Sequence, residues 1–377
     1  MNQKMHNISV RTWVEIDRRA IQKNYRTFRG LLSPTTKLMA VVKSNAYGHE
    51  LAGFSKEADK LGVDFLGVDS IIEGIALRKE GIKKQILVLG FTLPENFKIA
   101  SENNISLTVS SFDGLRVLKE NKFPLKIHIK IDTGMHRQGF YPADIPKVVE
   151  ILKKMPHAEV EGVYTHFANA KNPSFPADTD KQAAEFKKAT DVFEKAGLHF
   201  LKHASATAGA ILFPHYHFDM VRIGIGLYGL WPAKEVERAF LKHIKLSPVL
   251  SWKTVVAETK IVPKGEGIGY NFTEILRKDT KIAVCPIGYW HGFPRALSSV
   301  GHVLINGNRA RVLGRVSMDM ITVDVSGIKN VKAGDEVVII GKSGKEEITA
   351  YEFADYADTS CYEIVTRINP KIQRVFV

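Results

Sequence analysis

Apolar residues in the first two thirds of the chain form short runs that alternate with amphipathic stretches. Runs that are apolar at nearly every position are typical of parallel strands buried on both faces, and apolar residues every three to four positions are typical of helices that cover such a sheet. The expected strands are 37–42, 64–68, 85–89, 106–109, 126–131, 159–164, 200–204 and 221–228, and the expected helices include 53–61, 72–80, 112–120 and 180–196.

Eight strand–helix units between residue 37 and about residue 230 predict an α/β fold of the (β/α)8, TIM-barrel type rather than an open sheet. After about Lys245, runs of Val, Ile and Thr alternate with turns, and Asn306-Gly307 between two such runs indicates a β-hairpin. The later strands are expected at 252–261, 281–286, 302–305, 309–312, 321–325 and 336–340. We therefore predict a barrel domain over 12–245 and a mostly β domain over 246–377, with residues 1–16 belonging to either part.

The composition is that of a globular protein, with 45% hydrophobic and 25% charged residues in 377 positions. Cys285 and Cys361 are too far apart in sequence for a disulfide scaffold or a zinc cluster, so we expect no metal and a reducing, cytoplasmic location. The polar N-terminus, residues 1–11, resembles neither a signal peptide nor a membrane anchor, and no run approaches the roughly 20 apolar residues of a spanning helix. We expect a soluble protein without a membrane partner.

The net charge of +13 raises the question of nucleic-acid binding. The lysines, however, are scattered over the expected helices instead of forming one basic block. We therefore expect a solvated basic surface and no nucleic-acid partner.

Lys43 ends an apolar strand in the sequence AVVKSNAYGH, residues 40–49. A lysine there would lie at the carboxyl end of the barrel, where this fold places its active sites. Partial desolvation would favour the neutral amine, which can form a Schiff base with an aldehyde. A surface lysine that simply ends a strand is the alternative interpretation, and the strand alone does not separate the two.

Six further motifs follow in order: KIDTGMHR (130–137), YTHFA (164–168), RIGIGLYG (222–229), GY (269–270), PIGY (286–289) and GRVSMD (314–319). Together with residues 40–49 they make the chain resemble the alanine racemases over nearly its whole length. The resemblance implies a barrel followed by a β domain, a covalent bond between Lys43 and pyridoxal 5'-phosphate, and an isomerase that interconverts L-alanine and D-alanine. Its D-alanine would supply cell-wall peptidoglycan.

Racemisation is simplest with one base on each face of the cofactor. By resemblance these bases are Lys43 and Tyr270, with His166 and Arg222 near the tyrosine to favour its phenolate. The resemblance also places Arg222 against the pyridine nitrogen of the cofactor. Arginine keeps its proton, so the ring nitrogen would stay unprotonated and the carbanion short-lived, which favours racemisation over transamination.

The other expected site residues also come from the resemblance. Arg137 and the backbone near Met318 would bind the substrate carboxylate, Tyr289 would narrow the pocket, and Lys130 matches a lysine that some family members carry as a carbamate. The phosphate would be held by hydroxyl and backbone N–H groups of four residues: Tyr47, Thr207, Gly224 and Ile225. The family also implies a homodimer in which Tyr270 and Met318 reach the cofactor of the opposite subunit.

Three positions depart from the common family pattern. Ala206 stands where an amide is usual, His291 where a carboxylate is usual, and Pro370 where some members have a tyrosine that touches phosphate. These changes affect the expected width of the pocket, so a serine or broad-specificity racemase remains an alternative. A decarboxylase is disfavoured because such enzymes pair the ring nitrogen with an acid, and a non-catalytic cofactor-binding protein is disfavoured by the second domain with Tyr270.

Overall fold

The computed structural model describes residues 10–120 and 123–377, so most of the N-terminal stretch discussed above (1–9) lies outside the described residues. The described chain divides into two compact units. One unit comprises residues 19–46 and 51–247, and we call it the barrel unit. The other comprises the described residues up to Arg18, residues 47–50 and residues 248–377, and we call it the β unit.

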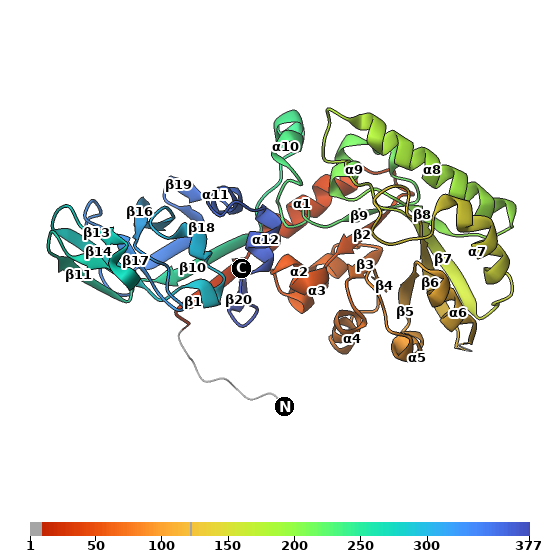
Figure 1. Ribbon diagram of the computed structural model, residues 1–377, viewed down its shortest axis with the longest axis horizontal. Coiled ribbons are helices and arrows are strands. Elements are labelled where there is room, and N and C mark those ends of the chain that lie inside the picture. Colours follow the sequence, from red (N-terminus) through yellow and green to blue (C-terminus); the bar gives the residue numbers. More distant parts are fainter. Residues whose placement is uncertain (1–9, 121–122) are drawn as a thin grey trace. The chain divides into compact units, whose positions relative to one another are not determined.

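Within the described residues, eight parallel strands form the sheet of the barrel unit in the order β8-β7-β6-β5-β4-β3-β2-β9 (Figure 1). These strands are β2 (Lys37–Val41), β3 (Phe65–Val68), β4 (Gln85–Val88), β5 (Ile105–Val109), β6 (Leu125–Lys130), β7 (Ala158–Tyr164), β8 (Leu201–His203) and β9 (Met220–Ile223). Backbone bonds from Asp219 N–H to Lys202 and from Arg222 N–H to Ser205 join the two edges. The sheet therefore closes into the predicted barrel.

Helices follow the barrel strands and lie outside them (Figure 1). They are α3 (Leu51–Lys60), α4 (Ile71–Lys79), α5 (Phe97–Glu102), α6 (Phe112–Glu120), α7 (Ile145–Leu152), α8 (Pro176–Lys195), α9 (Thr207–Leu212) and α10 (Lys234–Phe240), with α1 (Arg18–Gly30) preceding the first strand. Ser70 caps α4 by accepting a hydrogen bond from Glu73 N–H, which starts this helix directly after β3.

One predicted strand is too long. The apolar stretch 221–228 leaves the sheet at Ile223, and residues 224–229 form tight turns in which Leu227 N–H bonds to the Gly224 carbonyl. Gly226 permits this close folding, because a Cβ there would lie 2.3 Å from the Phe28 ring. The end of the apolar run is therefore a buried loop and not a strand.

The β unit holds a larger sheet, whose ordered path among the described residues is β11-β14-β17-β16-β15-β18-β10-β1-β20. Its strands are β1 (Thr12–Ile16), β10 (Leu250–Val255), β11 (Glu258–Val262), β14 (Thr280–Cys285), β15 (His302–Ile305), β16 (Asn308–Leu313), β17 (Ile321–Asp324), β18 (Glu336–Ser343), β19 (Glu346–Ile348) and β20 (Gln373–Phe376), with β12 (Gly267–Ile268) and β13 (Glu274–Ile275) forming a separate pair. Because β1 pairs with β10 and β20, the N-terminal strand belongs to this sheet.

Three details of the β unit bear on the sequence predictions. The hairpin at Asn306-Gly307 is confirmed, since Ile305 pairs with Asn308 and both turn residues have positive φ. The prediction of a single strand over 252–261 is wrong, because this segment forms two strands, β10 and β11. Two helices, α11 (Ala350–Tyr356) and α12 (Cys361–Thr366), follow the strands and add helical structure that the β-rich pattern did not predict. The domain boundaries at 245 and 246 stay a prediction.

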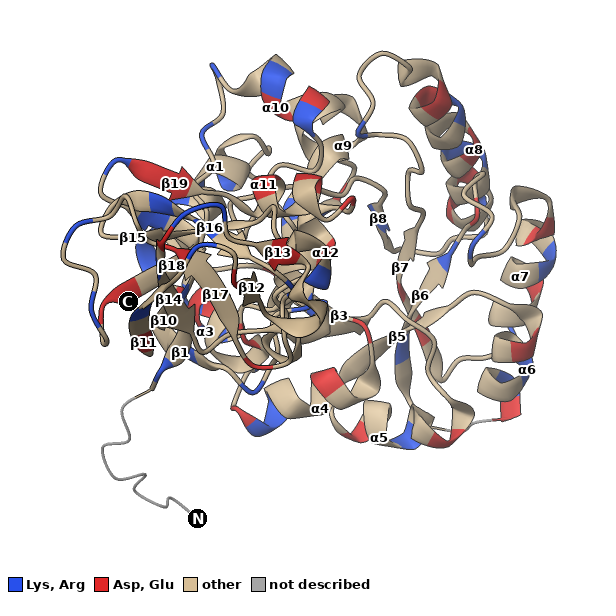
Figure 2. Cartoon of the chain, turned by 60° about the vertical axis from the view of Figure 1, so that its left-hand side comes forward, with Lys and Arg blue, Asp and Glu red and all other residues tan. Residues whose placement is uncertain are grey.

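Positions of basic and acidic residues are interspersed along the ribbon of both units (Figure 2). In the part of the chain that the structure describes, no helix has the length and apolar character needed to cross a bilayer. The two cysteines, Cys285 and Cys361, are both buried.

Candidate functional site

The carboxyl ends of the barrel strands carry most of the polar residues that the motifs single out. Lys43 follows β2, Lys130 ends β6, His166 follows β7, and Arg222 lies in β9. In a closed parallel barrel these strand ends share one rim, which is where barrel enzymes bind their ligands. The barrel unit thus gathers Lys43, Lys130, Arg137, His166, Thr207, Arg222, Gly224 and Ile225.

The segment after Lys43 has an unusual backbone. Ser44, Asn45 and Ala46 have φ between 51° and 56° with ψ between 45° and 52°, and Tyr47 also has positive φ, so α2 (Lys43–Tyr47) is a left-handed turn. Such a turn costs roughly 1–2 kcal/mol per residue other than glycine. Its hydrogen bonds hold it in place: Asn45 N–H donates to Glu73, and the Asn45 side chain accepts from Leu51 N–H.

Lys43 has an acceptor that sequence reasoning missed. Its Nζ donates to Asp69 Oδ1 at 3.0 Å, and Asp69 directly follows β3. Glu73 accepts from Asp69 N–H at 2.8 Å and from Asn45 N–H at 3.3 Å, so one carboxylate ties the two loops together. An aspartate one residue beyond the strand next to β2 was the available signal, since neighbouring strand ends meet at the rim.

The loop after β6 is built around Asp132. Its carboxylate accepts hydrogen bonds from the N–H groups of Gly134, His136 and Arg137 at 3.0–3.1 Å. Burial raises the pKa of Asp132, but these backbone bonds outweigh it and the net pKa is lowered. This arrangement is the physical reason for the DTGMHR sequence, because it turns the chain so that Arg137 faces the strand ends.

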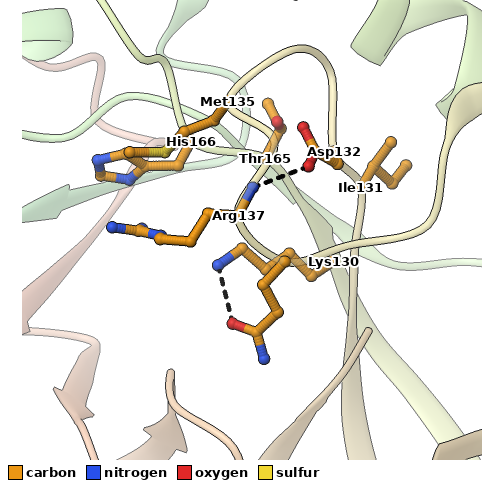
Figure 3. Close-up of a pocket in the computed structure, with 8 residues that line it drawn as sticks. Lys130, Ile131, Asp132, Met135, Arg137, Thr165 and His166 are labelled. Atoms are coloured by element: carbon orange, nitrogen blue, oxygen red, sulfur yellow. Dashed lines mark hydrogen bonds between the residues drawn. The ribbon is translucent and has the colours of Figure 1, made fainter. Parts of the chain in front are cut away.

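A small pocket lies inside this loop (Figure 3). The nitrogen-bearing ends of Lys130, Arg137 and His166 point to the same side of it (Figure 3). Lys130 Nζ donates to Gln138 Oε1 at 3.2 Å. Burial, together with the charges of Arg137, Arg222 and Lys43, lowers the pKa of Lys130 to about 8. The pocket is therefore rich in positive charge.

Arg222 is buried in the barrel and bonded entirely to neutral groups. Its Nη2 donates to the carbonyls of Thr165 and Ala204 at 2.8 Å, and its Nη1 donates to His203 Nδ1 at 2.9 Å. Burial lowers its pKa to about 10, which still leaves it charged at neutral pH. In residues 10–120 and 123–377 no carboxylate forms an ion pair with Arg222 and no acceptor is bonded to its Nε, so a donor remains for a ligand.

His166 accepts from Arg222 at its Nδ1, at 3.3 Å. Burial, and then the charges of Arg222, Arg137 and Lys130, lower the pKa of His166 to about 3. His166 is therefore neutral at physiological pH, with its proton on Nε2, because Arg222 can only donate.

Thr207 and the loop after β9 form a cluster of small donors. Thr207 Oγ1 accepts from Gly224 N–H at 3.3 Å and from Gly226 N–H at 3.4 Å, so hydroxyl and backbone groups converge. Ala206 is one of the three departures from the family pattern. Its backbone forms a bridge with that of Arg222, so main-chain bonds fix the position of this residue.

The β unit contains the remaining predicted residues: Tyr47, Tyr270, Tyr289 and Met318. Tyr289 N–H donates to the Ser317 carbonyl and Trp290 N–H to the Met318 carbonyl, both at 3.0 Å, so the structure brings Tyr289 and Met318 together. Gly288 is needed there, because a Cβ would lie 2.2 Å from the Ser317 oxygen. Tyr270 is 68% exposed and Met318 54% exposed.

Two other departures from the family pattern have clear positions. His291 is buried, and its Nδ1 accepts from Gly288 N–H at 3.2 Å, so it supports the loop that carries Tyr289. Pro370 is exposed in the turn before β20. Tyr47, the tyrosine expected at the phosphate, lies beside the ring of Tyr362 within the β unit, with ring centroids 6.2 Å apart.

These features define a class: a (β/α)8 barrel with a cationic site at its carboxyl end, followed by a β unit with exposed aromatic loops. Family models match in both parts, "Alanine racemase, N-terminal domain" over residues 16–232 and "Alanine racemase, C-terminal domain" over residues 249–376. The chain belongs to the alanine racemase family.

Individual relatives match over almost their full length. The alanine racemase of Symbiobacterium thermophilum is 40% identical over 97% of each chain, and that of Methanococcus maripaludis is 40% identical over 97% of this chain and 98% of its own. The crystal structure of alanine racemase from Bacillus anthracis with bound L-Ala-P has a TM-score of 0.93 at 35% identity, covering 99% of this chain and 96% of its own. An alanine racemase structure from Clostridium difficile has a TM-score of 0.92 at 35% identity, covering 98% and 97%.

Proposed function

We propose that this protein interconverts L-alanine and D-alanine with pyridoxal 5'-phosphate as its cofactor. The observation that carries the proposal is the buried, charged Arg222 without a carboxylate partner among the described residues, in the same barrel end as Lys43. An enzyme that holds the cofactor carbanion for long would place an acid against the ring nitrogen. A guanidinium in that position favours rapid return of the proton, which is racemisation.

The donor set fits this cofactor. Lys43 offers an amine for the aldehyde, and Arg222 Nε offers a donor for the ring nitrogen. The Thr207 hydroxyl and the N–H of Ile225 offer donors for the phosphate, and the N–H of Gly224 would join them on exchanging its bond to Thr207 Oγ1 for one to the phosphate. By resemblance, Tyr47 adds a phosphate contact. When bound, pyridoxal phosphate supplies an aldehyde that bonds to amines and an electron sink that acidifies the α-carbon of an amino acid.

In this proposal the protein's own groups move the protons. With cofactor and substrate bound, Lys43 Nζ would take or return the α-proton on one face, and the Tyr270 hydroxyl would do so on the other. Arg137 binds the substrate carboxylate, assisted by the backbone at Met318, while Tyr289 limits the side chain to a small size. Neutral His166 can hydrogen-bond the tyrosine oxygen through Nε2.

Further parts of the proposal are a homodimer with shared sites, a cytoplasmic location and a role in supplying D-alanine for peptidoglycan. The exposure of Tyr270 and Met318 in the β unit supports the dimer, because exposed aromatic and apolar side chains often mark a surface that another subunit covers. Each site would then combine Lys43 of one subunit with Tyr270 of the other.

A covalent-trapping experiment tests the cofactor assignment. Purified protein is mixed with pyridoxal phosphate, reduced with borohydride, digested and examined by mass spectrometry. We expect the added mass on Lys43, no label there in Lys43→Ala, and normal labelling in Lys37→Ala, which changes a lysine at the opposite end of the same strand. Unlabelled wild-type protein would overturn the proposal.

A chiral product assay tests the substrate. L- and D-forms of alanine, serine and larger amino acids are each incubated with the loaded enzyme, and both enantiomers are quantified. We expect alanine to be converted in both directions and with the highest kcat/KM. A preference for serine would instead assign the alternative specificity, and conversion of none of them would refute racemisation.

A further inference from the structure

A chain of hydrogen bonds runs through the interior of the barrel from Arg222. Arg222 Nη1 bonds to His203 Nδ1 at 2.9 Å, His203 Nε2 to His128 Nδ1 at 2.9 Å, and His128 Nε2 to Glu161 Oε2 at 3.1 Å. Arg222, His203 and His128 are buried, and the Glu161 side chain is 10% exposed. No motif pointed to His128 or Glu161, and the proposed mechanism does not use them.

The two ends of this chain fix its direction. Arginine has donors only, so His203 Nδ1 must accept and its proton must be on Nε2. That proton is donated to His128 Nδ1, which leaves the His128 proton on Nε2 to be donated to Glu161. A carboxylate at the far end accepts without a donor of its own. All the protons therefore point the same way, from Arg222 to Glu161.

Glu161 is held ionised by its other neighbours. Ser106 Oγ donates to Oε2 at 2.5 Å, and Lys126 Nζ lies 3.3 Å from Oε1. Burial raises the pKa of Glu161, but the hydrogen bonds from His128 and Ser106 and the charge of Lys126 outweigh it, and the net pKa is lowered. The chain of hydrogen bonds that begins at buried Arg222 and passes through two imidazole rings therefore ends at a negatively charged acceptor.

The surrounding packing is shaped for the two rings. A Cβ at Gly162 would lie 2.2 Å from His128 Nδ1, so glycine is required beside that ring. The His203 ring stacks on Tyr164 with centroids 4.7 Å apart and an interplanar angle of 7°. Tyr164 is itself anchored, with its hydroxyl 2.9 Å from that of Thr108. Neither ring can turn without disturbing the barrel interior.

We propose that His128 and Glu161 are positioning residues for racemisation, which fix the tautomer of His203 and thereby keep Arg222 oriented as a hydrogen-bond donor toward the cofactor ring. The inference rests on the proposed function, because it assigns Arg222 to that ring. Without the carboxylate, His128 and His203 could adopt the opposite tautomers. His203 Nδ1–H would then face an Arg222 N–H, and the arginine would have to move.

Nitrogen-15 NMR of the loaded enzyme labelled at histidine tests the direction of the chain without relying on turnover. Wild-type protein should show His128 and His203 as neutral rings protonated at Nε2, each identified by loss of its signals in a His→Asn variant. In Glu161→Gln these signals should shift or broaden as tautomers mix. Nδ1-protonated or doubly protonated rings in the wild type would overturn the proposal even if Glu161→Gln failed to fold.

Kinetics supply the second readout. Glu161→Gln should lower kcat for alanine with little change in KM, by no more than the about 10- to 100-fold usual for a group bonded directly to a functional residue, because Glu161 is three hydrogen bonds from Arg222. Glu161→Asp keeps the charge and should restore part of the loss. The control is Glu159→Gln, which removes the same charge from an exposed position of β7 and should change neither the spectra nor kcat.

The outcomes separate the two levels of the proposal. Unchanged histidine signals and unchanged kcat in folded Glu161→Gln would refute the positioning role while leaving racemisation intact. If wild-type protein racemised no amino acid, the proposed function would fail, yet the wild-type spectra would still decide whether the chain runs from Arg222 to Glu161.

Discussion

At the scale of single residues, the ion pair between Lys43 and Asp69 holds the amine in place before the cofactor binds. The Nζ–Oδ1 distance is 3.0 Å, and the side chains are 38% and 54% exposed. Pairs this open contribute roughly 0.2–1 kcal/mol. Lys43 Nζ must leave this hydrogen bond before it can attack an aldehyde, so capture of the cofactor requires the pair to break.

Asp69→Asn should therefore speed covalent capture of pyridoxal phosphate at neutral pH, by about 1.5- to 5-fold if the pair has the usual strength. Stopped-flow absorbance after mixing protein with cofactor measures this rate. Glu80→Gln, which breaks the similarly exposed Lys56–Glu80 pair, is the matched control and should leave it unchanged. A slower capture in Asp69→Asn would mean that the carboxylate orients the amine productively.

Lys130 provides a pH-dependent prediction. Its pKa is lowered to about 8, mainly by burial and then by neighbouring cations. Only a neutral amine adds carbon dioxide, so a carbamate on Lys130 should be scarce well below pH 8 and increase as the pH rises through that value. Carbon-13 NMR with labelled bicarbonate should show the signal grow from pH 7 to pH 9 and disappear in Lys130→Ala, but not in Lys60→Ala at an exposed site. A signal already complete at pH 6 would contradict this.

At this scale, the sequence predicted a site residue only where that residue belongs to a motif. Lys43, Arg137, His166 and Arg222 belong to recognisable motifs. Asp69 follows a strand, and His128 and Glu161 lie on strands, so all three are ordinary charged or polar residues that only the closed barrel connects to the motif residues. The hydrogen bonds that connect them to one another, to Lys43 and to His203 span 26 to 75 positions in sequence, so no local pattern could identify them.

At the scale of elements, the β-hairpin at Asn306-Gly307 shows how local turn chemistry fixes register. Gly307 has φ +74° and Asn306 φ +48°, as a two-residue turn of the primed type requires. Gly307→Ala should lower the free energy of unfolding by about 1–2 kcal/mol, because alanine is strained at positive φ. Urea denaturation followed by circular dichroism measures it.

The control for this prediction is Gly327→Ala. A Cβ at Gly327 meets no atom within 4 Å and its backbone does not lie in the left-handed region. Alanine there should leave stability unchanged or raise it slightly, by restricting the unfolded chain. Equal effects at both glycines would argue against the turn as the source of the difference.

Element types were predictable where periodicity was strong. The strands of the barrel follow from their apolar runs and the hairpin from its dipeptide. The sequence could not reveal that the run 221–228 ends its strand at Ile223, because buried loops and buried strands are equally apolar. The left-handed turn after Lys43 could not be predicted either, because residues 44–47 are Ser, Asn, Ala and Tyr, and none of them is a glycine.

At the scale of the whole molecule, subunit complementation tests the proposed shared site. Lys43→Ala and Tyr270→Phe should each be inactive or nearly so as homodimers. If each site takes Lys43 and Tyr270 from different subunits, a hybrid dimer contains one intact site. Refolding an equal mixture should then restore about a quarter of wild-type activity, since about half of random dimers are hybrids with one good site of two. No recovery in verified hybrids would place both residues in one subunit.

The buried guanidinium of Arg222 and its cationic neighbours also make the protein sensitive to the anions in its buffer. The pocket lined by Arg137 and Lys130, with the buried charge of Arg222 close enough to lower the pKa of Lys130, should attract small anions from the buffer. Sulfate or inorganic phosphate in a buffer would protect such a protein from heat and, by the same contacts, compete with the phosphate of the cofactor. Apparent cofactor affinity should accordingly be weaker in phosphate than in a zwitterionic buffer of equal pH and ionic strength.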